Sequence, residues 1–141
     1  MTPEQTRDDG DGSRRFAARP PRNGAGVGKV DLTTDLVESM VQLASDANLI
    51  VGQGHPYFDS DDGRLVRHAA DAIVIKFHDL CERLSPAVRE RHPTIPWRDI
   101  KGMRNRLGHQ YRSNDYNLIW NTLATDIPTV VAELRSELSE G

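Results

Sequence analysis

Apolar residues recur at every third or fourth position from Thr33 onward, which is the spacing of one face of an α-helix. The first such segment begins at Thr33 or Thr34, either of which is a suitable N-cap, and the stretch 52–56 breaks it with two glycines and a proline. We therefore expect a long amphipathic helix here. Its apolar face consists of Leu36, Met40, Leu43, Ala44, Ala47 and Val51.

A second, broader apolar stripe follows a polar loop that ends at Gly63. The width of the stripe implies that this helix touches more than one neighbour. Directly after it, Ser85 stands at an N-cap position and Pro86 at the first position of a short helix that reaches about Arg91. The stripe comprises Leu65, Ala69, Ala70, Ala72, Ile73, Phe77, Leu80, Cys81 and Leu84.

A third main helix is predicted to begin after Pro96, which breaks the preceding segment. Gly108 weakens this helix, so we expect its end to fray near Tyr111. The helix runs through Trp97, Ile100, Met103, Arg104 and Leu107.

A fourth helix is predicted from Asp115, with Ser113 or Asn114 as its N-cap. Pro128 should kink or restart this helix, with Asp126 as a local cap. Its inward positions are Ile119, Trp120, Leu123, Ile127, Val130, Val131, Leu134 and Leu138.

The pattern contains no alternation of apolar and polar residues longer than a few positions, so it gives no support for β-strands. Short connections between amphipathic helices favour antiparallel neighbours. We therefore predict an all-α fold, an antiparallel bundle of four or five helices.

Residues 1–30 differ from the rest of the chain. Phe16 is their only aromatic residue, and they contain a Pro-Pro pair and a Gly-Ala-Gly-Val-Gly run. Such a segment buries too little apolar area to offset the entropy of ordering it. We predict a flexible tail over 1–30 and a helical domain over 31–141. The glycines do not match a phosphate-binding loop in spacing, and a linker is the simpler interpretation.

Composition narrows the class of protein. The chain has 141 residues, a net charge of −3 and one cysteine, Cys81, which rules out an intramolecular disulfide framework and fits a reducing compartment, so we expect a cytoplasmic protein. No apolar run approaches the length of a membrane span, and we expect no membrane contact. One basic stripe, from Arg89 to Arg112, holds seven basic residues against two acidic ones. A solvated helix face and a nucleic-acid contact both fit this stripe.

Candidate chemistry lies in the segment from Met103 to Tyr111. On a helix, Arg104, Gly108, Asn105 and His109 fall at about 0°, 40°, 100° and 140°, which is one polar sector. Gly108 leaves the middle of the sector without a side chain, so that a ligand or a second backbone can approach closely.

An arginine offers a permanently charged fork for phosphate oxygens, and a histidine both takes and gives a proton near neutral pH. Arg104 and His109 together therefore suit phosphodiester chemistry. The plainer alternative is an exposed arginine and a helix-ending histidine that complements the helix dipole.

The same segment carries a family resemblance. The stretch from Arg91 to Tyr111, with Leu84-Ser-Pro before it and Asp115-Tyr-Asn-Leu-Ile-Trp after it, resembles the HepT-like toxin family of the HEPN superfamily, and the likeness spans about residues 33–139. The family signature is an Arg followed by a polar residue, a His four to six positions later and a Tyr two beyond the His. Arg104, Asn105, His109 and Tyr111 match each position. Upstream, Lys76-Phe-His-Asp stands near the place where many relatives carry Ile-Gly-Glu-Ala.

The resemblance implies a HEPN-type helical bundle and a ribonuclease toxin that acts without a metal or a cofactor, as a homodimer whose two Arg104/His109 motifs share one cleft. It also implies a nucleotidyltransferase antitoxin as partner, which transfers AMP to Tyr111. A two-fold axis supplies a second imidazole, so that one His109 removes the proton of the ribose 2′-OH and the other protonates the leaving oxygen. Supporting contacts to RNA are expected from Lys101, Asn105, Arg106 and Arg112.

Other interpretations remain open from the sequence. A non-catalytic HEPN module that binds a nucleotide or a partner explains the same motif, and a purely structural helical adaptor gives Arg104 no task. Trp97 and Trp120 are expected as core anchors rather than base-stacking platforms. Cys81 is expected as a packed thiol, and the remaining histidines are too scattered for a zinc site.

Overall fold

A computed structural model describes residues 31–109 and 115–138, with the side chains of 108 and 109 left out. The predicted tail, residues 1–30, lies outside the described residues. Residues Leu32–Gly141 form one compact unit. The described elements are, in chain order, α3 (Thr33–Gly52), α4 (His55–Asp59), η1 (Asp61–Gly63), α5 (Arg64–Arg83), α6 (Pro86–Arg91), α7 (Trp97–His109), α8 (Tyr116–Asn121), η3 (Thr122–Asp126), α9 (Ile127–Leu134) and η4 (Arg135–Glu137).

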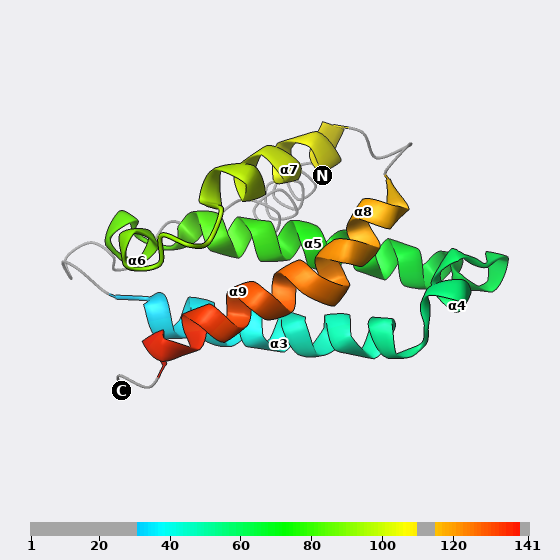
Figure 1. The fold of residues 1–141 in the computed structure, drawn as a ribbon, viewed down its shortest axis with the longest axis horizontal. Helices are drawn as coiled ribbons and strands as arrows, with labels where there is room; N and C mark the ends of the chain where they lie inside the picture. Colours follow the sequence, from blue (N-terminus) through cyan, green and yellow to red (C-terminus); the bar gives the residue numbers. More distant parts are fainter. Residues whose placement is uncertain (1–30, 110–114, 139–141) are drawn as a thin grey trace, which may run out of the picture. The chain divides into compact units, whose positions relative to one another are not determined.

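The long helices alternate in direction along the bundle. Figure 1 shows α3 and α5 side by side and antiparallel, with α7 and the continuous α8–η3–α9 segment completing the arrangement. α5 packs against α3, α7 and α8, whereas α9 packs mainly on α3. The predicted all-α antiparallel bundle is confirmed. No helix in the described ranges combines the length and apolar character of a membrane span.

The core is formed by one side of each long helix. Val37 and Met40 of α3, Phe77 of α5 and Leu134 of α9 are almost fully buried, as is Phe58 of α4. On α5 the predicted stripe is too wide: Leu65 is 69% exposed, and Ala69 and Ala72 are exposed as well. α3, α7 and α8 pack on the side of α5 that faces away from Leu65, Ala69 and Ala72. Val74 and His78, which the predicted stripe did not include, are therefore buried.

The segment predicted as a polar loop before Gly63 contains two short helices. Gly54 turns the chain at a φ of +97°, and α4 begins directly after it. The guanidinium of Arg67 then donates to the carbonyls of Phe58 and Ser60 at 2.6 and 2.7 Å. A Cβ at Gly63 would lie 2.2 Å from the Tyr57 carbonyl oxygen, so only glycine fits there.

The predicted helix caps are partly wrong. Leu32 rather than Thr33 or Thr34 is the N-cap of α3, and no side chain bonds there. Ser85 caps α6 as predicted, accepting from the backbone N–H of Val88 at 3.2 Å.

At the start of α8, Asp115 itself is the cap, because its carboxylate accepts from the backbone N–H groups of Asn117 and Leu118 at 3.0 and 3.2 Å. The predicted alternatives, Ser113 and Asn114, lie outside the described residues.

The last helix restarts near Pro128, as predicted, through one π-helical turn, η3. The backbone N–H of Ile127 donates to the carbonyl of Thr122, five residues back. Pro128 has no N–H to continue the α-helical ladder, and the wider turn gives its ring room beside the preceding carbonyls. Asp126 has helical backbone angles and makes no cap hydrogen bond, so its predicted role as a local cap is wrong.

A buried ionic cluster joins α6 to the C-terminal end. The Nε2 and Nδ1 atoms of His92 lie 2.6 and 3.1 Å from carboxylate oxygens of Glu137 and Glu133. Arg91 pairs with Glu137 through two guanidinium nitrogens at 3.1 and 2.7 Å. The side chains of His92 and Glu137 are 6% and 9% exposed, so the bond between them is shielded from solvent, whereas Arg91 and Glu133 are largely exposed.

The cluster ties protonation to stability. Burial disfavours the charged imidazole, but the hydrogen bonds that it donates to Glu137 and Glu133 outweigh this effect and raise the pKa of His92 above its ordinary value of 6.5. Stability from this source is complete below pH 6.5 and is lost as the pH rises through the folded pKa. His78 acts in the opposite sense, because desolvation lowers its pKa to about 4, so its contribution falls as the pH drops below 6.5.

We predict that His92→Gln lowers the free energy of unfolding by about 2 kcal/mol at pH 6, where the charge-assisted bonds are lost, and by less at pH 9. Chemical denaturation of the wild type and the variant at each pH measures the difference between their free energies of unfolding. His78 is present in both proteins, so its opposing contribution cancels in this difference. A difference that stays constant from pH 6 to pH 9 contradicts an ionised His92 in the cluster.

Candidate active site

Helix α7 carries the candidate residues and is anchored at its start. The indole N–H of Trp97 lies 3.2 Å from the carbonyl of Arg89 and 3.1 Å from that of His92, and it donates to both. Leu107 is buried, and Ile100 and Met103 pack against the core. These contacts fix the rotation of α7 about its axis, and therefore which of its residues face solvent.

Arg104 is held by a carboxylate from the neighbouring helix. Its Nε donates to Oδ1 of Asp79 on α5 at 2.8 Å. The two side chains are 34% and 52% exposed, so the pair stays open to solvent and contributes little to stability. This single bond uses the Nε edge of the guanidinium, and no described group accepts a hydrogen bond from the two terminal nitrogens. The arrangement positions Arg104 and leaves its terminal nitrogens for an anion.

The backbone of α7 stays helical through Gly108 to His109. His109 follows Arg104 by five positions on the helix, which corresponds to about 7.5 Å along the axis and about 140° around it. The predicted polar sector therefore has helical backbone over its whole length from 104 to 109, although the side chain of His109 is not described.

The supporting residues lie in two groups. Lys101, Asn105 and Arg106 are exposed on α7. Lys101 and Asn105 lie within about 100° of Arg104 around the helix, whereas Arg106 lies about 200° away, on the opposite side. Tyr111 and Arg112 lie outside the described residues.

Sequence reasoning missed Asp79. It lies 25 residues from Arg104, on a different helix, and no local spacing links the two. The only available signal was its position in the Lys76-Phe-His-Asp segment, which differs from the sequence that many relatives carry there.

The expectations for the two tryptophans and for Cys81 are confirmed. Trp97 and Trp120 both pack against the core, and Trp120 stacks on the ring of His55 at 4.6 Å. Cys81 is 2% exposed, and burial raises the pKa of its thiol to about 12, so the reactive thiolate is suppressed. Within the described ranges, no group of three or more His, Cys, Asp or Glu side chains is arranged to hold a metal ion.

Comparison with known proteins places this site in a family context. The chain matches the family described as Ribonuclease HepT-like over residues 32–137. It is 34% identical over 59 residues to a protein of Caldanaerobacter subterraneus subsp. tengcongensis named "Putative RNase TTE0752", a match that covers 42% of this chain and 53% of that protein. No solved structure gives a significant match.

Two archaeal proteins are similar as well. "Putative RNase MJ1380" of Methanocaldococcus jannaschii is 27% identical over 78 residues, covering 55% of this chain and 72% of that protein. "Probable ribonuclease HepT" of Thermococcus cleftensis is 44% identical over 39 residues, covering 28% of this chain and 36% of that protein.

The matched chain thus spans about half the length of the first of these relatives. The family match extends over all the described helices, from α3 to η4, and includes both Asp79 and the segment from Arg104 to His109. By its sequence match and its helical bundle, the chain belongs to the HepT-like ribonuclease family.

Proposed function

We propose that this protein is a metal-independent endoribonuclease, the toxin of a type VII-like toxin–antitoxin pair. The observation that carries the proposal is the Arg104–Asp79 pair, whose N–O distance is 2.8 Å. Asp79 holds the partly exposed guanidinium of Arg104 in one orientation, and Arg104 lies on the same helix as His109. Family membership and the names of the relatives support RNA as the substrate.

The proposed chemistry is attack of the ribose 2′-oxygen on the adjacent phosphorus. One His109 accepts the 2′-OH proton as the new P–O bond forms, and a second His109 gives a proton to the leaving 5′-oxygen as the old bond breaks. Arg104 stabilises the negative charge that develops on the phosphate oxygens. The products are a 2′,3′-cyclic phosphate and a 5′-hydroxyl, and DNA is resistant because it lacks the nucleophile.

The mechanism calls for two imidazoles, and each chain supplies one at this motif. We therefore propose a homodimer in which the two α7 helices meet, so that each chain contributes one Arg104 and one His109 to a common cleft. Lys101, Asn105 and Arg106 are exposed on the same helix and would contact the RNA backbone, together with Arg112.

We predict that the purified protein cleaves single-stranded RNA in the presence of EDTA and leaves the matching DNA intact. His109→Ala and Arg104→Ala should each lower the rate by at least about a hundredfold. Electrophoresis of an end-labelled RNA measures the rate, and the end groups identify the cyclic phosphate.

Arg64→Ala removes an exposed cation at the first position of α5, fifteen residues before Asp79, so it is the matched control and should cleave at the wild-type rate. Loss of activity in EDTA would refute the metal-independent mechanism. If the wild type binds RNA or a nucleotide but never cleaves, the non-catalytic HEPN module is the better account.

We predict that Asp79→Asn lowers kcat/KM by about tenfold, because the guanidinium of Arg104 loses the carboxylate that orients it. The thermal midpoint should change little, since the pair is exposed. Asp79 is a positioning residue, so its substitution in an Arg104→Ala background should have no further effect on the residual rate. Additive losses in the double variant would show that Asp79 acts through another group.

Regulation is proposed to act at Tyr111, through transfer of AMP from ATP by a nucleotidyltransferase antitoxin. The added phosphodiester brings a negative charge and a bulky purine close to the candidate site along the chain, and both oppose RNA binding.

We predict that the protein gains the mass of one or more AMP units when it is incubated with the cognate transferase, ATP and magnesium, and that cleavage stops. Tyr111→Phe should stay unmodified and active, as intact-mass spectrometry and the cleavage assay would show. Modification of Tyr111→Phe at the wild-type rate would place the control site elsewhere, and inhibition without any mass change would indicate simple complex formation.

A further inference from the structure

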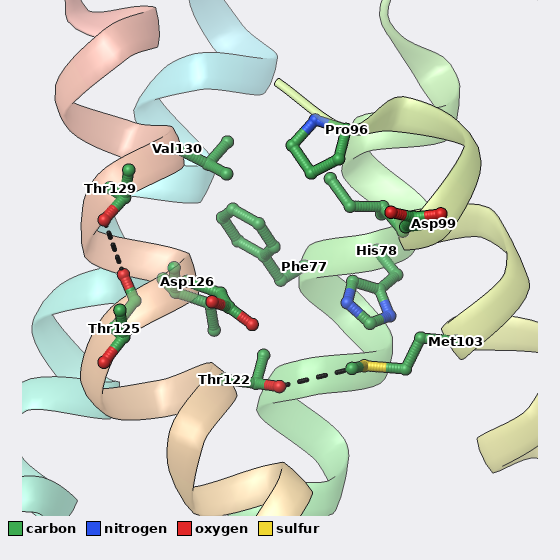
Figure 2. Close-up of a pocket in the computed structure, with 12 residues that line it drawn as sticks. Phe77, His78, Pro96, Asp99, Met103, Thr122, Thr125, Asp126, Thr129 and Val130 are labelled. Carbon is green, nitrogen blue, oxygen red and sulfur yellow. Dashed lines mark hydrogen bonds between the residues drawn. The ribbon is translucent and has the colours of Figure 1, made fainter. Parts of the chain in front are cut away.

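A cavity lies between α5, α7 and the η3–α9 segment. Its volume is about 360 Å³, which is in the range of small-molecule sites. Figure 2 shows Phe77 and His78 projecting into it from α5, with Asp126 on the opposite wall. On α7 this cavity touches Met103 and Asp99, whereas Arg104 pairs with Asp79 and does not line it. The cavity is therefore distinct from the candidate active site.

His78 brings an unsatisfied polar atom to this cavity. Its side chain is among the buried polar groups at 3% exposure, and its Nδ1 has no hydrogen-bond partner within the part of the chain that the structure describes. Desolvation lowers the pKa of His78 to about 4, with Asp79 raising it and Arg104 lowering it further, so the imidazole is neutral at pH 7. A buried polar atom without a hydrogen bond lowers the free energy of unfolding, and its presence calls for a functional explanation.

Two of the threonine hydroxyls that line the cavity already donate to backbone carbonyls. The hydroxyl of Thr122 donates to the carbonyl of Leu118 at 2.9 Å, and that of Thr129 donates to the carbonyl of Thr125 at 2.8 Å. Their protons are therefore engaged, while lone pairs on both oxygens remain available. A ligand can therefore donate hydrogen bonds to the hydroxyl oxygens of Thr122 and Thr129.

The charge of the cavity has one sign. Asp126 and Asp99 line it, and the described lining includes no lysine or arginine. Desolvation raises the pKa of Asp126, and no described cation pairs with its carboxylate. Both residues are exposed, so solvent screens their charges, but an anionic ligand would still meet two carboxylates without a counter-charge, whereas a cation would be attracted to them.

The remaining wall is apolar and includes an aromatic ring. Phe77 lies in the middle of the cavity in Figure 2, with Pro96 and Val130 around it, and Met103 contributes a thioether. The face of an aromatic ring attracts a cation and also packs against a flat apolar body.

The π-helical turn shapes one side of this cavity. Thr122, Thr125 and Asp126 all belong to η3, and all three line the cavity. A π-turn is less favourable than a regular α-helical turn, and such turns are frequent at functional sites.

We propose that this cavity is a binding site for a small organic cation with an apolar body, an amine or amidine whose N–H groups face Asp126 and the threonine oxygens while its body packs on Phe77. The proposal does not depend on ribonuclease activity. It rests on the cavity, on the Nδ1 atom of His78 that has no partner within the described residues, and on the two carboxylates of the lining, which has no basic residue among the described ones.

Three probes of one shape but different charge test the proposal: benzamidine, benzamide and benzoate. We expect benzamidine to bind the full-length protein about tenfold more tightly than either of the others, as measured by NMR titration. Asp126→Asn should remove this preference, whereas Glu38→Gln, which removes one exposed negative charge on α3 outside the cavity, should keep it. Equal binding of benzoate, or no binding of any probe to the wild type, overturns the proposal.

His78→Leu separates a binding role from a structural one. If Nδ1 of His78 binds a ligand, the variant should have a higher thermal midpoint than the wild type, because it no longer buries an unsatisfied polar group. The variant should also bind benzamidine more weakly than the wild type. A lower midpoint with unchanged benzamidine binding would assign His78 to the core alone and overturn its part in the site.

Discussion

The packing of α3 and α7 around α5 is the constraint on which the rest of this structure depends. α5 contributes Val74, Phe77 and Cys81 to the core, and it touches α3, α7 and α8. Its rotation about its own axis decides what its polar residues can reach. With Phe77 turned inward, Asp79 emerges beside α7, where it meets Arg104. The orientation of the candidate catalytic arginine thus follows from apolar burial on a different helix.

The sequence was sufficient for features whose cause is local. The Ser85-Pro86 start of α6, the restart at Pro128 and the amphipathic face of α3 follow from residues within a few positions of each other. The helical spacing of Arg104 and His109 belongs to the same group, since α7 is continuous from Trp97 to His109.

Features that depend on tertiary contacts were not predictable. Asp79 and Arg104 are brought together by two packed helices, and the cluster of Arg91, His92 and Glu137 joins segments about 45 residues apart. The burial of His78 has the same cause, because its polar ring is enclosed only when α7 and η3 are in place. The prediction that Leu65 is buried was wrong for the opposite reason, because its apolar side chain lies on a face of α5 that no described helix covers.

The ionic cluster at the C-terminal end also gives the fold a mechanical connection. Glu133 and Glu137 hold His92, and the backbone carbonyl of His92 accepts from the indole that anchors the first residue of α7. The last described turn of the chain therefore braces the helix that carries Arg104. A partner or a fused domain that displaces Glu133 and Glu137 would therefore change the position of His92. The carbonyl of His92 accepts from the indole of Trp97, so this change would reach the start of α7 without any contact to Arg104.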